Sequence, residues 1–291
     1  MLNIKDIQLR DRREPVEVAE IRRKIEEAFC RLEFQEGPHK YYVHEDDGTV
    51  RELPCVSEVT RKFAPYVDWD ACAERKAQRL GMAKADLLRQ WEEGRVKASN
   101  NGTSTHLFGE AYMHFFMGHP EKMSPVVMPQ FDEGYLVPYS KKQEAVEAFY
   151  TELLGVENIY PVMPETQVYM GLNLDWADVM PYAGTFDMLF AYKASDGEWK
   201  LLLYDWKTNA GLTSDYNRKF GNMALVPFDD MVDEDLTYYT LQLNCYALCL
   251  NQIGFEVADR KVIWLKEDGT FEKISLPDIS ERLRGALKIN K

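Results

Sequence analysis

Two acidic residues and one lysine stand at the ends of two neighbouring strand-like segments. Asp187 ends the segment 184–187, and Asp205 and Lys207 lie two positions apart in the next segment. The pair Asp196-Gly197 between the segments predicts a hairpin turn. Because side chains alternate faces along a strand, Asp205 and Lys207 point the same way, and Asp187 can come alongside them. We expect two carboxylates and one ammonium to converge there, a combination suited to a divalent cation and a phosphate.

An ordinary solvated strand is the alternative, since an acidic residue two positions before a lysine is common. The residues that precede Asp205, Leu201 to Tyr204, are apolar or aromatic and indicate a buried strand that delivers polar groups at its end. Burying a charge without a partner is costly. The buried strand therefore favours a functional site.

Further candidates stand in two helical segments and one alternating segment. His106 and Glu110 are four residues apart and share one helix face, as do Gln242 and Tyr246. Glu165 lies in an alternating, strand-like segment before the hairpin. A lone histidine on a helix is usually structural, so the spacing to Glu110 alone does not assign His106 a role.

In this order, the residues resemble the PD-(D/E)XK nucleases, in particular the RecB-like exonuclease branch. That branch has a Gly-x-x-x-His-x-x-x-Glu helix, an acidic strand residue, a Gly-x-x-Asp hairpin with Asp-x-Lys, and a Gln-x-x-x-Tyr helix. The corresponding residues here are Gly102 to Glu110, Glu165, Gly184 to Asp187 with Asp205 to Thr208, and Gln242 to Tyr246. The Asp-Trp-Lys-Thr variant is similar to that of mitochondrial genome-maintenance exonucleases and many phage-encoded nucleases. The resemblance covers about half the chain, and the N-terminal hundred residues match only loosely.

The resemblance implies a metal-dependent deoxyribonuclease, an exonuclease of DNA recombination, repair or replication that uses one or two Mg²⁺ or Mn²⁺ ions. It implies single- or double-stranded DNA as substrate and a recombination or single-strand-binding protein as a partner. Lys207 would act on the attacking water or the phosphate, and Glu165 would orient Lys207 or a second ion. The implied metal ligands are His106, Asp187, Asp205 and the backbone carbonyl of Trp206. The implied substrate-positioning residues are Gln242, Tyr246, Glu110 and Thr208.

Length and composition permit one large domain or two small ones, and the charge weighs against broad capture of nucleic acid. Hydrophobic residues make up 45% of the 291 residues, enough for a sizeable core. The net charge of −13, from 35 basic and 48 acidic residues, opposes general electrostatic binding to DNA. Basic residues must then be local to any DNA path. Arg75, Lys76 and Arg79 share a face by helical spacing and are candidates for contacting the DNA backbone, with a plain solvated face as the alternative.

The cysteines and the chain start indicate a reduced, intracellular protein. An odd number of scattered cysteines, five, is typical of that compartment, and we expect all five to be small buried apolar residues. No Cys-x-x-Cys occurs, and Cys245 and Cys249 lie on one helix, so we expect no iron–sulfur cluster. No run approaches the roughly 18 apolar residues of a membrane span, and the charged segment Met1 to Glu14 is unlike a secretory signal. The expected location is the cytoplasm, that of a bacterial host if the chain is phage-encoded, with no membrane partner.

The pattern of helices and strands predicts an α/β fold with a central mixed sheet flanked by helices. The resemblance implies a restriction-endonuclease-like core, placed at 99–291, with an N-terminal helical and hairpin extension at 1–98. The expected elements are helices at 16–34, 57–63, 68–95 with a break at Gly81, 103–116 after a turn at 100–103, 140–154, 236–253 and after Pro277; strands at 159–170 and in hairpins at 40–53, 184–207 and 261–274; and irregular segments at 118–140 and 208–237.

Two other classes of function stay open. One is a catalytically inactive nuclease-fold protein for DNA binding or assembly, which the charge of −13 favours slightly. The other is a metal-dependent enzyme acting on a small phosphorylated substrate. No Gly-x-x-x-x-Gly-Lys-Ser loop occurs, which argues against an ATPase.

Overall fold

The computed structural model describes residues 14–132, 135–156, 158–172 and 178–288. The expectation that the chain start is not a secretory signal concerns residues 1–14, almost all of which lie outside the described residues. None of the described helices is both long and apolar enough to cross a bilayer.

The predicted mixed sheet is confirmed. Its five strands lie in the order β10-β9-β8-β7-β6, and every neighbouring pair is antiparallel except β8 and β9, which are parallel. The chain passes from β8 to β9 through two helices, α7 (Asp215–Phe220) and α8 (Asp235–Asn251). The strands are β6 (Ile159–Met170), β7 (Tyr182–Lys193), β8 (Trp199–Lys207), β9 (Val257–Leu265) and β10 (Phe271–Ser275).

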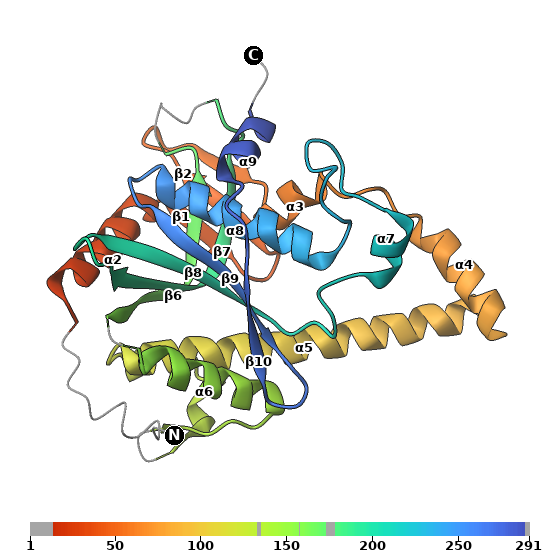
Figure 1. The fold of residues 1–291 in the computed structure, drawn as a ribbon, viewed down its shortest axis with the longest axis horizontal. Helices are drawn as coiled ribbons and strands as arrows, with labels where there is room; N and C mark the ends of the chain where they lie inside the picture. Colours follow the sequence, from red (N-terminus) through yellow and green to blue (C-terminus); the bar gives the residue numbers. More distant parts are fainter. Residues whose placement is uncertain (1–13, 133–134, 157, 173–177, 289–291) are drawn as a thin grey trace.

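Helices cover both faces of this sheet (Figure 1). On β8, Leu201 and Leu203 pack into the core that contains α8 (Asp235–Asn251), whereas Leu202, Tyr204 and Trp206 pack toward α5 (Lys84–Phe116) and α6 (Lys141–Leu154). Two cores therefore sandwich the sheet, and alternation along β8 sends its side chains to both. A buried strand of this kind is what the apolar run before Asp205 predicted.

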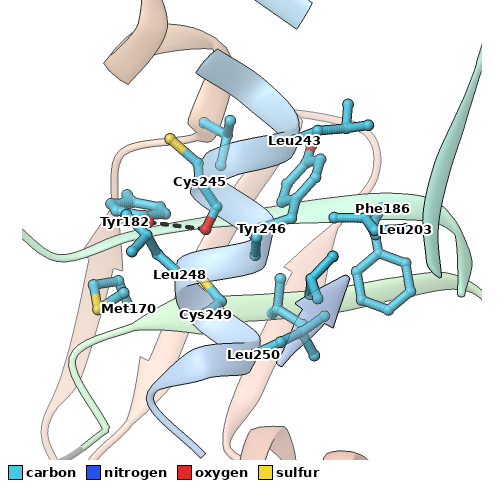
Figure 2. Packing of buried hydrophobic residues seen from close by; sticks show 14 of the residues in the cluster. Met170, Tyr182, Phe186, Leu203, Leu243, Cys245, Tyr246, Leu248, Cys249 and Leu250 are labelled. Carbon is cyan, nitrogen blue, oxygen red and sulfur yellow. Dashed lines mark hydrogen bonds between the residues drawn. The ribbon is translucent and has the colours of Figure 1, made fainter. Parts of the chain in front are cut away.

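Helix α8 is buried on most of its circumference and packs on strands β6 to β9 of the sheet (Figure 2). The Tyr182 hydroxyl donates a 2.9 Å hydrogen bond to the Cys245 carbonyl, which ties the helix to β7. Cys245 and Cys249 are buried in this core, as predicted. The prediction that all five cysteines are buried is wrong, because Cys30 is exposed at the end of α2, and Cys55 and Cys72 are only partly buried.

The N-terminal region forms a helix and a three-stranded antiparallel sheet. Helix α2 (Val16–Phe29) ends five residues before the predicted end, and the chain enters β1 (Leu32–Gln35), which pairs with β2 (Lys40–His44). Pairing with β2 overrides the helical spacing of the apolar residues. The predicted hairpin of β2 and β3 (Val50–Leu53) is confirmed.

The short helix after this sheet is α3 (Val56–Arg61), and it begins one residue before the predicted cap, Ser57. Cys55 occupies the N-cap position, because the Glu58 side chain accepts a 2.9 Å hydrogen bond from the Cys55 backbone N–H.

The prediction of a new helix at 103–116 is wrong. Helix α4 (Trp69–Leu80) does stop at Gly81, which is left-handed at φ 64°, but α5 then runs unbroken for 33 residues. The Asn100-Asn101-Gly102 stretch lies inside it, and the proposed border between residues 98 and 99 falls within the same helix. A Cβ built on Gly102 would lie 3.4 Å from Thr208 Oγ1, an ordinary contact distance.

The remaining elements follow the predicted order. Ser140 caps α6 as expected by accepting from the Gln143 N–H. The predicted loop 118–140 contains two short 3₁₀ turns (Pro120–Lys122 and Met128–Gln130) and the two-residue strands β4 (Phe131–Asp132) and β5 (Tyr135–Leu136). The irregular segment 208–237 contains α7 (Asp215–Phe220). The terminal helix is α9 (Ser280–Ala286).

Candidate metal and catalytic site

Three potential metal ligands converge from three elements. His106 on α5, Glu165 on β6 and Asp187 on β7 each offer a ligand atom, and these atoms lie within 4.8 Å of one another. The His106 Nδ1 atom is 3.4 Å from Asp187 Oδ2 and 3.6 Å from Glu165 Oε1. Two carboxylates and one imidazole are a donor set that a divalent cation accepts.

The sheet register places the two carboxylates face to face. Pro164 pairs with Met188 and Thr166 pairs with Phe186, so Glu165 stands opposite Asp187. Like charges directly opposite on antiparallel strands repel each other. Glu165 also has a positive φ of 37°, an uncommon backbone conformation for a residue with a side chain. The fold therefore holds the two carboxylates together despite their mutual repulsion and the unfavourable backbone conformation of Glu165.

Asp205 and Lys207 form a buried ion pair beside this cluster. The Lys207 ammonium contacts Asp205 Oδ2, and only 2% of the Asp205 side chain and 13% of the Lys207 side chain are exposed. Asp205 Oδ2 has no hydrogen-bond partner besides this ionic contact. Asp205 is not among the three clustered residues, whereas Glu165 is, so the clustered set differs from the expected ligand set. The Trp206 backbone meets the site through its N–H, which donates a 2.7 Å hydrogen bond to Asp187 Oδ2.

Close packing of α5 on β8 brings His106 to the strands. Trp206 is fully buried, and its indole lies against Gly109, where an added Cβ would come within 2.6 Å of Trp206 Nε1. The Gly109 carbonyl also accepts a 2.9 Å hydrogen bond from the Tyr150 hydroxyl. One helical turn before Gly109, His106 faces the carboxylates.

The pKa values of the clustered groups record their burial and mutual repulsion. Burial, reinforced by the charge of Asp187, raises the pKa of Glu165 to about 7 and that of Asp205 to about 6. Burial would lower the pKa of His106, but the Asp187 and Glu165 carboxylates outweigh it and raise that pKa well above its usual value. Burial would likewise raise the pKa of Asp187, but His106 and Lys207 hold it below its usual value.

Lys207 is held protonated. Burial would lower its pKa, but the carboxylates of Asp205 and Asp187 raise it above its usual value. Its ammonium also lies 4.3 Å from the centre of the Tyr239 ring, a cation–π contact. Tyr239 was not among the sequence candidates. It lies three residues before Gln242 on α8, and that helical spacing is the signal that would have found it.

Gln242 and Tyr246 lie on the same face of α8 and pack on the start of β7. Gln242 Nε2 donates a 3.1 Å hydrogen bond to the Tyr246 hydroxyl. A Cβ on Gly184 would lie 2.7 Å from Tyr246 Cε1, so the glycine of the Gly-x-x-Asp segment makes room for this ring. Gly184 lies three residues before Asp187 on β7, and neither Gln242 nor Tyr246 belongs to the cluster of potential ligands.

Two other candidates have partners outside the cluster. Glu110 Oε1 lies 3.6 Å from His114 Nε2, one turn further along α5. The carbonyl of Thr208 accepts a 2.5 Å hydrogen bond from Lys142 Nζ on α6. The side chain of Lys142 is only 11% exposed, and it was not a sequence candidate because a lysine in the first turn of a helix has no distinguishing pattern.

The basic candidates on α4 lie far from the cluster. The Lys76 ammonium lies 5.1 Å from the centre of the Trp91 ring on α5, and Trp91 precedes His106 by about 22 Å along the helix. Arg75 donates to Cys72 Sγ at 3.2 Å. Arg79 is in the last turn of the same helix. Helix α4 and the first half of α5 project from the body of the molecule (Figure 1), so these three residues do not join the site.

A cavity of about 310 Å³ opens beside the acidic residues. Its walls come from β6, β7 and α8, and from the N-terminal sheet and α3; they include Glu165, Asp187, Gln242 and Tyr246. Comparison with known proteins adds no family to this description, because no protein-family model matches the chain and no curated protein matches it.

Proposed function

We propose that this protein is a divalent-metal-dependent nuclease that hydrolyses DNA phosphodiester bonds, an exonuclease of DNA recombination, repair or replication. The observation that carries the proposal is the convergence of His106, Glu165 and Asp187 beside the buried Lys207. The mixed sheet, with its acidic residues on three adjacent strands, is consistent with a restriction-endonuclease-like core.

The donor groups fit Mg²⁺ or Mn²⁺. Glu165 and Asp187 offer carboxylate oxygens, which both ions accept, and the His106 imidazole is a ligand that Mn²⁺ accepts more readily. The buried Asp187 and the partly exposed Glu165 oppose each other, and the pKa of Glu165 is raised, an arrangement that a cation would relieve. These three residues would hold the ion, with the under-bonded Asp205 next to them. A bound ion would activate water and offset the charge that develops on the phosphate.

Lys207 contributes a fixed positive charge. The carboxylates of Asp205 and Asp187 raise its pKa and so favour the protonated ammonium. Asp205 and the Tyr239 ring hold it in place. A preorganised cation in a water-poor site stabilises negative charge on a phosphoryl group in the transition state. The role of Lys207 is thus electrostatic. The hydrogen bond from the Trp206 N–H separately fixes the position of the Asp187 carboxylate.

The test is a time course on end-labelled single- and double-stranded DNA with Mg²⁺, Mn²⁺ or a chelator. We expect metal-dependent release of nucleotides by the wild-type protein, and loss of release in Asp187→Asn and Lys207→Gln. Asp196→Asn, in the exposed turn of the same hairpin, and Lys200→Gln, on the same strand as Lys207, are the matched controls and should keep activity.

No release by the folded wild-type protein with either ion would overturn the proposal. DNA binding without cleavage would instead select the inactive nuclease-fold protein, the candidate that the net charge of −13 favours. The label position on the first products separates attack at an end from internal cleavage.

A further inference from the structure

We infer that the cavity beside the acidic residues binds one unpaired nucleobase, so that the preferred DNA substrate is single-stranded at the bond that is cut. The inference rests on the proposed nuclease function and names its substrate class. It comes from the N-terminal sheet, which contributes no residue to the metal cluster yet forms one wall of the cavity.

This wall is aromatic. Phe34 on β1 stacks on Tyr41 on β2, with ring centres 4.6 Å apart and planes at 27°, and His39 in the connecting turn meets Phe34 edge-on at 5.1 Å. Tyr41 is 2% exposed and lies behind, whereas Phe34 is half-buried and His39 is exposed. The accessible aromatic surface of the wall therefore belongs to Phe34 and His39. Successive bases of single strands stack on aromatic side chains of this kind.

The turn holds His39 in an unusual conformation. Its φ is 53°, in the left-handed region that most residues with side chains avoid, and its N–H donates a 3.1 Å hydrogen bond to the Glu36 carbonyl. Strain of this sort persists where the surroundings impose it, and it is found at binding sites. Here it accompanies an exposed imidazole at the cavity wall.

The aromatic wall is hydrogen-bonded to β7, the strand that carries the proposed metal ligand Asp187. The hydroxyls of Tyr41 and Thr185 are 3.0 Å apart, and Thr185 precedes Asp187 by two residues on β7. Glu165 and Asp187 line the same cavity as Phe34 and His39. A ligand that fills the cavity therefore reaches both the aromatic wall and the carboxylates of the proposed metal site.

The chemistry of the cavity suits a base better than a phosphate. Among the described residues that line it there is no lysine or arginine, so an anionic group would have no firm counter-charge. Its polar groups include the Gln167 and Gln242 amides and the Ser57 hydroxyl, which both donate and accept hydrogen bonds, as base edges require.

The size of the cavity points to one base rather than a duplex. At about 310 Å³ it stands at the small end of ligand pockets, which span roughly 300–1,000 Å³. A base inside a duplex has its faces covered by its neighbours and its edge paired, so it enters a pocket only after unpairing. An unpaired strand presents its bases without that cost.

The experiment measures binding and cleavage separately. Lys207→Gln, with Mn²⁺ present, is titrated into a fluorescein-labelled single-stranded oligonucleotide and into copies with one abasic position moved along the strand. We expect one abasic position to weaken binding about tenfold, which is within the range of one base–aromatic stack. Phe34→Leu and His39→Asn should weaken binding of the intact strand, and the abasic strand should lose nothing further. Asn tolerates the left-handed conformation of the turn, so this variant removes the ring and keeps the fold.

Phe271→Leu, a half-buried phenylalanine on the edge strand β10 in the opposite core, is the matched control and should bind as the parent protein. In the wild-type background, the same two variants should raise KM for single-stranded DNA and change kcat little. Equal binding of every abasic strand, unchanged binding by Phe34→Leu, or duplex ends cut as fast as single strands would overturn the inference. Because binding is measured without turnover, failure of the wild-type protein to cut DNA would refute the nuclease proposal and leave the base subsite to be decided by the abasic series.

Discussion

Replacing Gly109 by alanine should destabilise the protein, although alanine is the better helix former. Gly109 lies inside α5, where Gly→Ala ordinarily stabilises by roughly 0.5–1 kcal/mol. Here the new Cβ would lie 2.6 Å from Trp206 Nε1 and 3.0 Å from Cε2, distances that force the indole or the helix to move. Overpacking of this kind costs roughly 1–3 kcal/mol. The net change is thus a loss of stability of up to about 2 kcal/mol.

Gly94 in the same helix provides the opposite case. A Cβ on Gly94 would meet nothing within 4 Å, so Gly94→Ala should gain the full benefit of helix propensity. The two variants should differ in free energy of unfolding by about 1–3 kcal/mol, the overpacking cost alone. Urea denaturation followed by tryptophan fluorescence measures both, with circular dichroism as the check on native helix content.

A functional readout accompanies this change. The Trp206 N–H holds Asp187 Oδ2, so displacement of Trp206 should also weaken Mn²⁺ binding by Gly109→Ala and leave Gly94→Ala unaffected. If Gly109→Ala proved as stable as Gly94→Ala, the close approach of α5 to β8 would be wrong, and with it the account of how His106 reaches the carboxylates.

Three more predictions concern the site itself. The pKa of Glu165, about 7 without metal, lies above its ordinary value, and metal binding requires the ionised carboxylate. The pKa of His106 is also raised, and its imidazole must lose a proton to bind metal. Mn²⁺ affinity, followed by calorimetry, should therefore rise at least about tenfold from pH 6 to pH 8, and a flat profile would contradict this. Tyr239→Leu should lower kcat by up to about thirtyfold, equivalent to roughly 2 kcal/mol, because it removes the ring that holds the Lys207 ammonium. Tyr239→Phe keeps the ring and should keep the rate. Equal rates for both variants would exclude a cation–π role. Gly184→Ala, whose Cβ would come 2.7 Å from Tyr246, should lower the free energy of unfolding by about 1–3 kcal/mol, and an unchanged urea midpoint would count against that contact.

The sheet was predictable because its signals are local. The Asp196-Gly197 turn and the apolar run before Asp205 each specify a strand or its end within a few residues of sequence. Hairpin geometry then brings neighbouring strands together without further information. For the same reason Asp205 and Lys207 could be placed on one strand face, and the structure pairs them.

What escaped prediction depends on contacts between distant segments. The Asn100-Asn101-Gly102 stretch carries the signals of a helix start, yet it lies inside the continuous helix α5. Leu32 fits the helical spacing of the apolar residues in α2 but pairs with Val43 on β2. The position of Glu165 opposite Asp187 follows from strand register, which no local pattern specifies, so its place among the potential ligands could only be supposed from the resemblance.

The unbroken course of α5 has a mechanical consequence. Between Lys84, beside α4, and His106 the helix forms a rod of about 33 Å, with no glycine-induced kink or proline hinge along it. The outer end stands clear of the body (Figure 1), while the inner end carries the imidazole between two carboxylates. Because α5 is continuous, a tilt of its outer end would also move the segment that carries His106. A displacement too small to disturb the sheet would thereby open or tighten the imidazole–carboxylate spacing.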